Sequence, residues 1–246
     1  MKRIGAFLFY DVLEQRGKTG NPTLIQTDIW NGDVRYELFP EGGQLFSVSF
    51  FYKQFNNPVE ERVDGNSIGN IQSTFINTKS ATNFGAELEF RKTLSFISAA
   101  KIFEDLTVFG NLALIQSKVN VDGQDRALQG QSPYAVNFGI QYNNIESGLN
   151  ANITFNQVGR RINLVSGPGF PTVWENPRAL VDFQIGKKIF KQKGDIKFTI
   201  SDILNQYYRY YQDRNDNKKY DDDKLDNPYV AFRPGTTFGL SLSYRL

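Results

Sequence analysis

Apolar and polar residues alternate with a period of two along most of the chain, and this limits the folds that the chain can adopt. Between Thr82 and Leu94 one set of alternate positions is apolar and the other is charged, with Phe84, Ala86, Leu88 and Phe90 against Glu87, Glu89 and Arg91. A period of two is that of a β-strand, whose successive side chains point to opposite faces. Comparable alternation covers residues 30–38, 46–53, 134–142, 149–156, 179–186, 196–201 and 237–246. The sequence therefore predicts an all-β, antiparallel fold.

One further segment, 106–119, is apolar on both faces, so its orientation is not assigned. Short, turn-like connections lie at 40–44, 143–148 and 191–195, and they alternate with long polar ones at about 64–80, 122–132, 166–177 and 211–230. Such alternation places the short and long connections at opposite ends of the strands. The link at 95–104 is longer and partly apolar, and we expect a small helix or a wide turn there. Residues 1–246 are expected to form one domain.

A transmembrane β-barrel and a soluble β-sandwich both have alternating strands, and strand length separates them. Strands of sandwiches are typically about 5–6 residues long, whereas a tilted strand needs about 9–11 residues to cross the hydrocarbon. Several segments here reach or exceed that length, and their polar faces are rich in Asn, Ser, Thr and Gly. Tyr36, Tyr52, Tyr142 and Tyr244 lie near strand ends, as in the aromatic girdles of outer-membrane barrels. The sequence thus favours a multi-pass β-barrel of the cell outer membrane.

The composition excludes several classes of function. The chain has 28 basic and 26 acidic residues, a net charge of +2 that gives no electrostatic case for a nucleic-acid partner. It has no Cys and no His, which excludes disulfides, thiolate nucleophiles and His-dependent triads. No stretch of about 18 apolar residues predicts a membrane-spanning helix. The opening MKRIGAFLFYDVLEQR is interpreted as mature sequence or a truncation point and not as a signal peptide.

A series of segments resembles the barrel of TonB-dependent outer-membrane receptors. They are FLFYDV (7–12), GNPTL (20–24), DVRYELFPEGGQLFSVSFFYKQFNNPVE (33–60), NTKSATNFGAELEFRKTL (77–94), LQGQSPYAVNFGIQY (128–142), NPRALVDFQIGKKI (176–189), SDILNQYYRYYQD (201–213) and FRPGTTFGLSLSYRL (232–246). The resemblance spans nearly the whole chain and implies a barrel of about 22 strands that is closed by a plug domain. The chain would supply the C-terminal portion, nine long strands plus a possible tenth at Ala6–Val12. Its last residue is Leu246, where such barrels commonly end in an aromatic residue.

The same resemblance implies the partners. They are outer-membrane lipid, the remainder of the barrel and the plug on another segment or chain, the TonB complex acting through the plug, and a surface lipoprotein as a further candidate. Ten strands shaped for a wide barrel would leave two open edges, which lipid does not tolerate. The expected function is TonB-dependent uptake of a large or scarce nutrient, and no enzymatic activity is expected. The alternative is a self-contained outer-membrane barrel that acts as an adhesin or structural surface protein.

Three groups of residues are candidates for functional contacts. Six charged positions are expected to face the lumen or the plug, or to pair with one another, namely Arg35, Glu37, Glu87, Glu89, Arg91 and Asp182. Arg160 and Arg161 are candidates for gripping an anionic ligand, with an interfacial cation pair as the alternative. A weak calcium-loop pattern comprises Asp213, Asn215, Asn217 and Asp221, but Lys218 and Lys224 occupy its glycine and glutamate positions. The pair Glu87 and Glu89 also permits a glycosidase reading, which the absence of any pocket signal disfavours.

Overall fold

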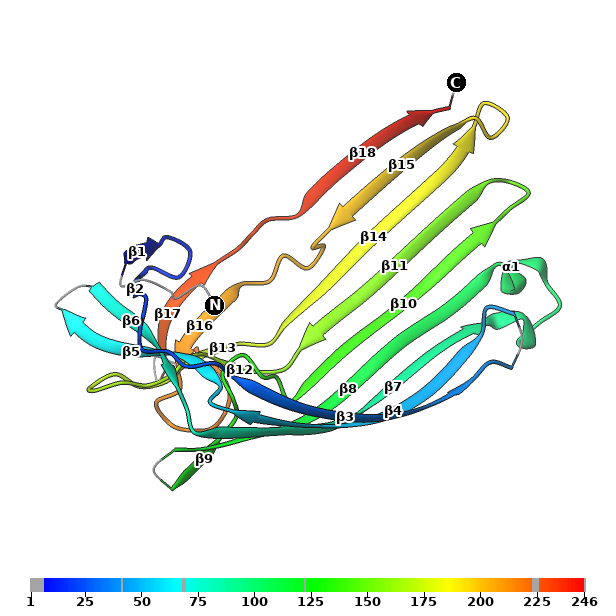
Figure 1. Cartoon of the computed structure of the whole chain (residues 1–246). Helices are drawn as coiled ribbons and strands as arrows, with labels where there is room; N and C mark the ends of the chain where they lie inside the picture. Colours follow the sequence, from blue (N-terminus) through cyan, green and yellow to red (C-terminus); the bar gives the residue numbers. More distant parts are fainter. Residues whose placement is uncertain (1–6, 41, 68–69, 122, 223–225, 246) are drawn as a thin grey trace.

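One large antiparallel sheet forms a curved wall, which we call the wall. The computed structural model describes residues 7–40, 42–67, 70–121, 123–222 and 226–245. In spatial order the wall contains β18 (Thr237–Tyr244), β15 (Gly194–Ser201), β14 (Arg178–Ile189), β11 (Leu149–Val158), β10 (Tyr134–Asn144), β8 (Leu106–Val121), β7 (Ser80–Thr93), β4 (Leu45–Asn56) and β3 (Asp28–Leu38), with the short β9 (Gln124–Arg126) paired to β8 (Figure 1). The nine expected long strands are therefore confirmed, each within a few residues of its expected bounds.

The register of the wall gathers apolar side chains on one face and polar side chains on the other. Leu88 of β7 lies opposite Val48 of β4 and Leu112 of β8. One residue earlier, Glu87 lies opposite Ser49 and Ala113. A shift of one residue would exchange the two faces, so pairing of like with like sets this register. The register also orients β8, the segment that the sequence left unassigned.

Aromatic rings on the polar face have a local explanation. Phe51 interrupts the polar set of β4, and its ring lies across Gly85, its register partner on β7. Phe109 of β8 lies in the same way across Gly139 of β10. A Cβ atom at Gly139 would come within 2.4 Å of the Phe109 ring. Each glycine therefore makes room for a ring on the adjacent strand, and the ring covers backbone that the glycine leaves bare.

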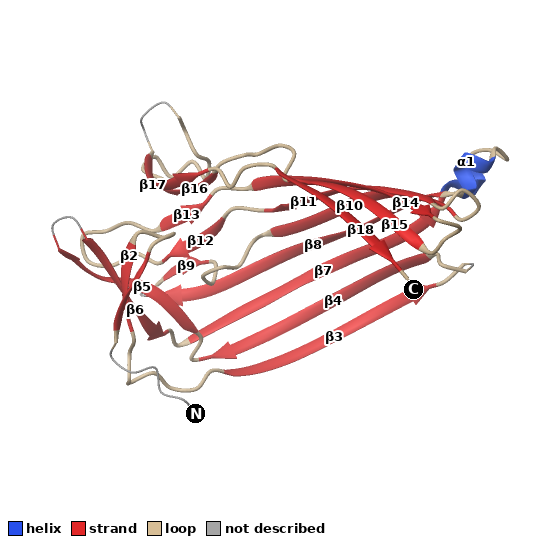
Figure 2. Ribbon diagram, turned by 90° about the horizontal axis from the view of Figure 1, so that it is seen from above, coloured by secondary structure: helices blue, strands red, loops and turns tan. Residues whose placement is uncertain are grey.

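The two ends of the wall differ, as the lengths of the connections predict. At one end, the turn end, short turns join β3 to β4, β10 to β11 and β14 to β15. The link between β7 and β8 also lies there and contains η1 (Leu94–Phe96) and α1 (Lys101–Glu104), which confirms the expected small helix. Figure 2 shows α1 at one end of the wall and the long connections at the other, which we call the loop end.

The long connections fold into two further sheets at the loop end. The first loop sheet has the order β1 (Leu8–Asp11), β2 (Arg16–Thr19), β6 (Asn70–Asn77) and β5 (Val59–Ser67). The second has the order β12 (Arg161–Leu164), β13 (Val173–Glu175), β16 (Tyr208–Gln212) and β17 (Asn227–Phe232). The segment 6–12 was expected as a tenth wall strand; residue 6 lies outside the described residues, and residues 8–11 pair with β2 instead. Four residues are too few to cross the hydrocarbon, which is why this strand belongs to a loop sheet.

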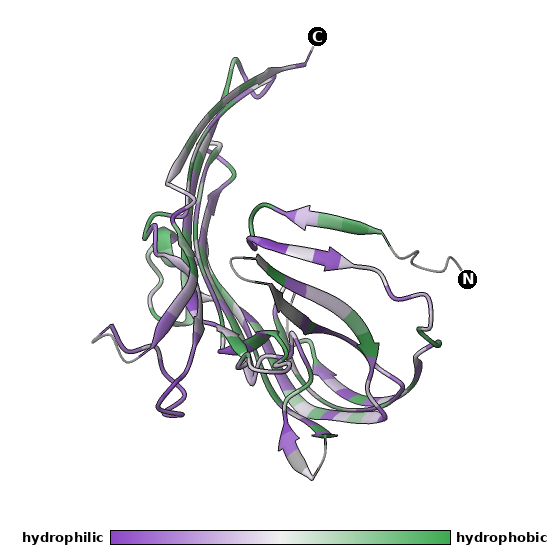
Figure 3. Ribbon diagram, turned by 90° about the vertical axis from the view of Figure 1, so that its left-hand side faces the viewer, coloured by the Kyte–Doolittle hydropathy of each residue, from purple (hydrophilic) through white to green (hydrophobic). Residues whose placement is uncertain are grey.

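Close packing is concentrated at the loop end. Val63, Leu164 and Val173 are fully buried there, and Ile71, Phe170, Tyr210 and Tyr229 pack against them. On the wall the opposite holds, because apolar side chains such as Phe50, 61% exposed, and Leu240, 74% exposed, face outward. The wall curves, and the first loop sheet lies on its concave side (Figure 3). Within the described ranges no second sheet covers the apolar face, so the sandwich alternative is wrong.

None of the helices that the structure describes has the length and apolar character needed to span a bilayer.

Candidate functional site

Charged residues of the polar face form an ion-paired group in the half of β3 and β7 that is nearer the turn end. Arg35 binds Glu37 through Nε and Oε1 at 2.5 Å, and Glu89 through Nη2 and Oε2 at 2.7 Å. All three side chains are about 40% exposed, so the ion-paired group is accessible to solvent. The sequence predicts pairing among these residues as one outcome, and the structure places them in such a group. Their contact with a plug or a substrate stays a prediction.

The other three charged candidates on the wall have different partners. Arg91 donates to the amide oxygen of Gln141 at 3.1 Å. Glu87 accepts from the Ser49 hydroxyl at 3.4 Å, and Asp182 accepts from the backbone N–H of Asp202 at 2.8 Å. Glu87 and Glu89 thus have separate partners, since Arg35 already binds Glu89.

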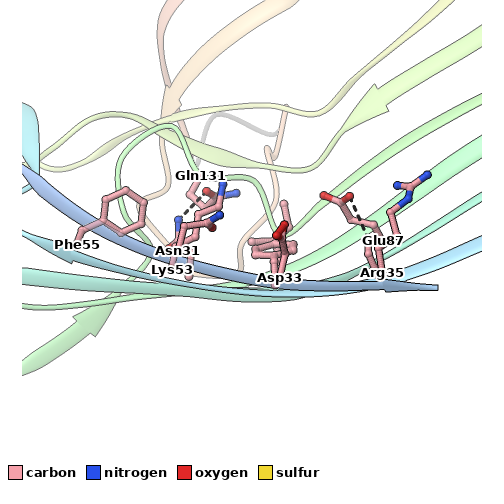
Figure 4. A pocket seen from close by; sticks show the side chains of 11 residues that line it. Asn31, Asp33, Arg35, Lys53, Phe55, Glu87 and Gln131 are labelled. Atoms are coloured by element: carbon pink, nitrogen blue, oxygen red, sulfur yellow. Dashed lines mark hydrogen bonds between the residues drawn. The ribbon is translucent and has the colours of Figure 1, made fainter. Parts of the chain in front are cut away.

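A pocket of about 370 Å³ lies over the polar face where β3, β4 and β7 run side by side. In Figure 4 the labelled side chains Asn31, Asp33, Arg35, Lys53 and Glu87 project to the same side of the ribbon. Gln131, from the connection that follows β9, accepts from the Asn83 amide at 2.9 Å. The pocket therefore mixes both signs of charge with amides, which suits a hydrated polar surface.

Two consecutive glutamates of β5 anchor the loop end, and sequence reasoning missed them both. Glu61 accepts two hydrogen bonds from Arg16 of β2, at 2.8 Å from Nε and 3.0 Å from Nη2. It also accepts from the Ser73 hydroxyl at 2.5 Å, and Arg16 is almost fully buried. Lys18 extends the cluster by contacting Glu14, Asp11 and Glu61. This cluster ties the β1–β2 hairpin to the rest of the first loop sheet.

The charged state of the two cations in this cluster is maintained by their carboxylate neighbours. Burial by itself would lower the pKa of Lys18, but the carboxylates of Glu14 and Asp11 outweigh it and the pKa is raised. The pKa of Arg16 is raised in the same way, with Glu61 as the main partner that opposes burial. Both cations therefore stay charged up to strongly alkaline pH.

Glu60 points away from Glu61 and anchors a different segment. Its side chain is fully buried and accepts from Arg126 of β9 at both carboxylate oxygens, with distances of 2.7 and 2.6 Å. The backbone N–H of Gln129 donates to it at 2.9 Å. The side chain of Gln129 in turn accepts from the N–H of Glu61 and donates to the carbonyl of Asn163. The signal in the sequence was the pair of acidic residues at adjacent, opposite-facing positions of one strand.

Arg160 and Arg161 are both engaged in ion pairs. Arg160 binds Asp213 at 2.6 Å and lies 3.7 Å from the centroid of the Trp174 ring. Arg161 makes a two-point contact with Glu175, at 2.7 and 3.0 Å. These contacts join β12, β13 and the connection after β16. Their proposed contact with an anionic ligand stays a prediction, because both guanidinium groups already have a carboxylate partner.

The candidate calcium loop is held by hydrogen bonds within the chain. Asp213 binds Arg160 and accepts from the N–H of Lys218 at 2.9 Å. Asp221 accepts from the amides of Asn215 and Asn217, at 2.7 and 2.6 Å. Among the residues described, no three His, Cys, Asp or Glu side chains gather as a metal site would require. Lys224 lies outside the described residues, and calcium binding stays a prediction.

Comparison with known proteins places the chain among outer-membrane barrels. The profile of the outer membrane protein beta-barrel family matches residues 14–244. No protein with a curated description matches the sequence.

Solved receptors have the same fold at low sequence identity. The siderophore receptor PirA from Acinetobacter baumannii is 16% identical with a TM-score of 0.58, over 93% of this chain and 33% of that one. The ferric enterobactin receptor PfeA from Pseudomonas aeruginosa is 13% identical with a TM-score of 0.56, over 98% and 35%. The copper transporter OprC is 13% identical with a TM-score of 0.60, over 90% and 32%. The chain thus spans about a third of the length of these structures, and the expected resemblance to receptor barrels is confirmed for the fold.

Proposed function

The chain belongs to the outer membrane protein beta-barrel family, and on that basis we propose that it forms part of the wall of a TonB-dependent transport receptor. It lies in the cell outer membrane as a multi-strand β-barrel wall, with its apolar face toward lipid. The loop end would capture a large or scarce nutrient on the cell surface. The compound would then pass along the polar face once a plug domain is displaced by the TonB complex.

The directions of the two edge strands carry this proposal. Within the described residues, β3 and β18 each have one wall neighbour, and both run from the loop end to the turn end. A wall of nine antiparallel strands that closed on itself would need a parallel seam between them. Parallel pairing is somewhat less stable per residue, and an open edge is not tolerated in lipid. An all-antiparallel barrel instead requires an odd number of further strands between β18 and β3. This requirement supports a second segment or chain that supplies those strands, which we call the partner wall, and it disfavours a self-contained adhesin barrel.

Uptake with and without TonB tests the transport role. The chain is tagged in its native outer membrane, its assembly is purified in detergent, and the co-purifying protein and small molecule are identified. Loss of the chain and loss of TonB should abolish uptake of that small molecule to the same extent. Uptake that persists without TonB would contradict the proposed mechanism.

Cross-linking tests the closure of the wall. The chain has no cysteine, so single cysteines can be introduced on β3 and on β18 without removing any native one. The proposal predicts no direct β3–β18 disulfide in native membranes at any register. An efficient disulfide across that seam would support the self-contained barrel and overturn the partner wall. The surface lipoprotein partner stays a prediction that the same purification would reveal.

A further inference from the structure

A pocket at the loop end contains an arginine that has no anionic partner among the residues that the structure describes. The pocket has a volume of about 540 Å³ and lies where β5, β9, β12 and β13 meet. Its polar and aromatic lining includes Arg62, Asp125, Arg126, Ser166, Thr172 and Trp174. It is separate from the pocket over the polar face, with which it shares no lining residue.

Arg62 is the cation of this pocket that no described carboxylate neutralises. Arg126 is bound at two points by Glu60, and the pocket carboxylate of Asp125 binds Lys118 at 2.6 Å. Among the described residues no carboxylate pairs with Arg62, and its Nε is buried without a hydrogen-bond partner. A buried donor without a partner is costly, and native proteins rarely leave one without a reason. The pocket therefore has one positive charge in excess.

The backbone holds Arg62 in place on both sides. The N–H of Val63 donates to the carbonyl of Val165 at 3.1 Å, and the N–H of Val165 donates to the carbonyl of Glu61 at 3.1 Å. Arg62 therefore forms a parallel β-bridge with Val165, in which the residues before and after it, Glu61 and Val63, are both hydrogen-bonded to the backbone of Val165. A fixed backbone lowers the entropy lost when the guanidinium binds a ligand.

The other groups of the pocket complement an anion that is attached to a ring. Trp174 lines the pocket, and its ring is already held by Arg160 at 3.7 Å. Ser166 and Thr172 add hydroxyl groups that can donate hydrogen bonds. The planar guanidinium group matches the two oxygens of a carboxylate or a phosphate. The other large pocket of the loop end differs, because the guanidinium of its Arg160 has a carboxylate partner in Asp213, although its Nε is likewise buried without a hydrogen-bond partner.

We propose that the Arg62 pocket is a binding subsite for an oxyanion, a carboxylate or a phosphate, carried on a ring that packs against Trp174. Arg62 would supply the charge-assisted hydrogen bonds, and the indole would supply apolar contact. The relevance of this subsite to import rests on the proposed transport function. Binding itself can be measured without uptake, so a failure of one experiment leaves the other interpretable.

Tryptophan fluorescence tests the subsite. The chain has only two Trp residues, and the exposed Trp30 can be replaced by Phe so that Trp174 reports on the pocket. The purified assembly that contains the full chain is titrated with benzoate, phenyl phosphate and benzyl alcohol. The fluorescence of a matched assembly that carries Trp174→Phe is subtracted. Both anions should perturb Trp174, and benzyl alcohol should bind at least tenfold more weakly. The stronger of the two anions identifies a carboxylate or a phosphate ligand.

Variants at position 62 show whether the guanidinium is responsible. Arg62→Gln should raise the Kd of both anions at least tenfold and leave benzyl alcohol unchanged, whereas Arg62→Lys should restore part of the affinity. Lys79→Gln removes an exposed cation on the nearby connection and should have no effect. Hydrogen exchange of β5 serves as the control for folding. Equal binding of benzyl alcohol and the anions, an unchanged Kd in Arg62→Gln, or no response of Trp174 to either anion would overturn the proposal.

Discussion

Replacement of Arg126 by methionine isolates the energetics of the buried pair that it forms with Glu60. The Glu60 side chain is fully buried, and Arg126 provides both of its side-chain hydrogen bonds, at 2.7 and 2.6 Å. In Arg126→Met the carboxylate keeps only the N–H of Gln129, at 2.9 Å. Loss of one partner from a buried pair typically costs about 3–5 kcal/mol, because an uncompensated charge remains.

An independent route gives a similar magnitude and adds a dependence on pH. A buried carboxylate can escape the penalty by taking up a proton. For a group with the ordinary glutamate pKa of about 4.3, this uptake costs about 3.7 kcal/mol at pH 7 and about 1 kcal/mol at pH 5. A proton bound only in the folded state stabilises it at low pH, and this stabilisation is lost as the pH rises. The variant should therefore be destabilised most at neutral pH and recover on acidification.

Native-state hydrogen exchange of β5 and β9 measures this local opening. After correction for intrinsic rates, exchange in Arg126→Met should be faster than in the parent by about 500-fold at pH 7 and about fivefold at pH 5. The double variant Glu60→Gln/Arg126→Met removes both charges and should recover most of the loss.

The neighbouring pair of Lys118 and Asp125 provides a matched control. Its distance is the same, 2.6 Å, but both side chains are about half exposed. Lys118→Met should leave exchange almost unchanged, because exposed pairs contribute little. A penalty in Arg126→Met that does not vary with pH, or an equal penalty in Lys118→Met, would refute the reasoning from burial.

Three further predictions address the wall and the second loop sheet. Leu112→Arg places a charge on the lipid face and should lower the free energy of unfolding by about 2–4 kcal/mol, as measured by urea unfolding from lipid vesicles. Ala113→Arg places the same charge on the polar face and should be nearly neutral. Equal losses of stability would contradict the assignment of the faces. Gly139→Ala should cost about 1–3 kcal/mol in the same assay, because the new methyl group would lie 2.4 Å from the Phe109 ring, and the double variant with Phe109→Ala should relieve the clash. Burial raises the pKa of Tyr211 from 10.0 to about 12, so the folded state retains a proton that the unfolded state loses, and stability should fall as the pH rises through that range. Tyr211→Phe should reduce this alkaline loss, as measured by urea unfolding followed across the same pH range, and an undiminished loss would contradict the assignment.

The wall could be predicted from residues close together in the sequence. Side chains at positions 84, 86 and 88 share one face of a strand and those at 87 and 89 share the other, because the period of a strand depends only on local backbone geometry. The lengths of the connections then ordered the strands and separated the two ends. The orientation of β8 was the exception, since Phe109, Ala113 and Ile115 make its second face apolar as well, and only the pairing with Glu87 and Gly85 of β7 and with Gly139 of β10 identifies that face as the polar one.

The candidate site was less predictable, because it depends on which connections meet. The charges on the wall were identified by their position on the polar face, and the structure places Arg35, Glu37 and Glu89 together. The anchors of the loop end were missed, since Glu61 and its partner Arg16 are 45 residues apart. Arg160 and Arg161 were identified as cations, but their carboxylate partners come from β13 and from the connection after β16.

Local alternation was enough to specify nine strands and, in all of them except β8, the face that each residue occupies, because a strand's side-chain directions need no distant contact. The folded chain alone decided that residues 8–11 leave the wall and that Glu60 and Glu61 anchor two different segments. It also decided that Arg62 has no carboxylate partner among the residues described here. These outcomes depend on long-range ion pairs and buried contacts, whose partners are selected by the packing of the loops and are not encoded in any periodic pattern.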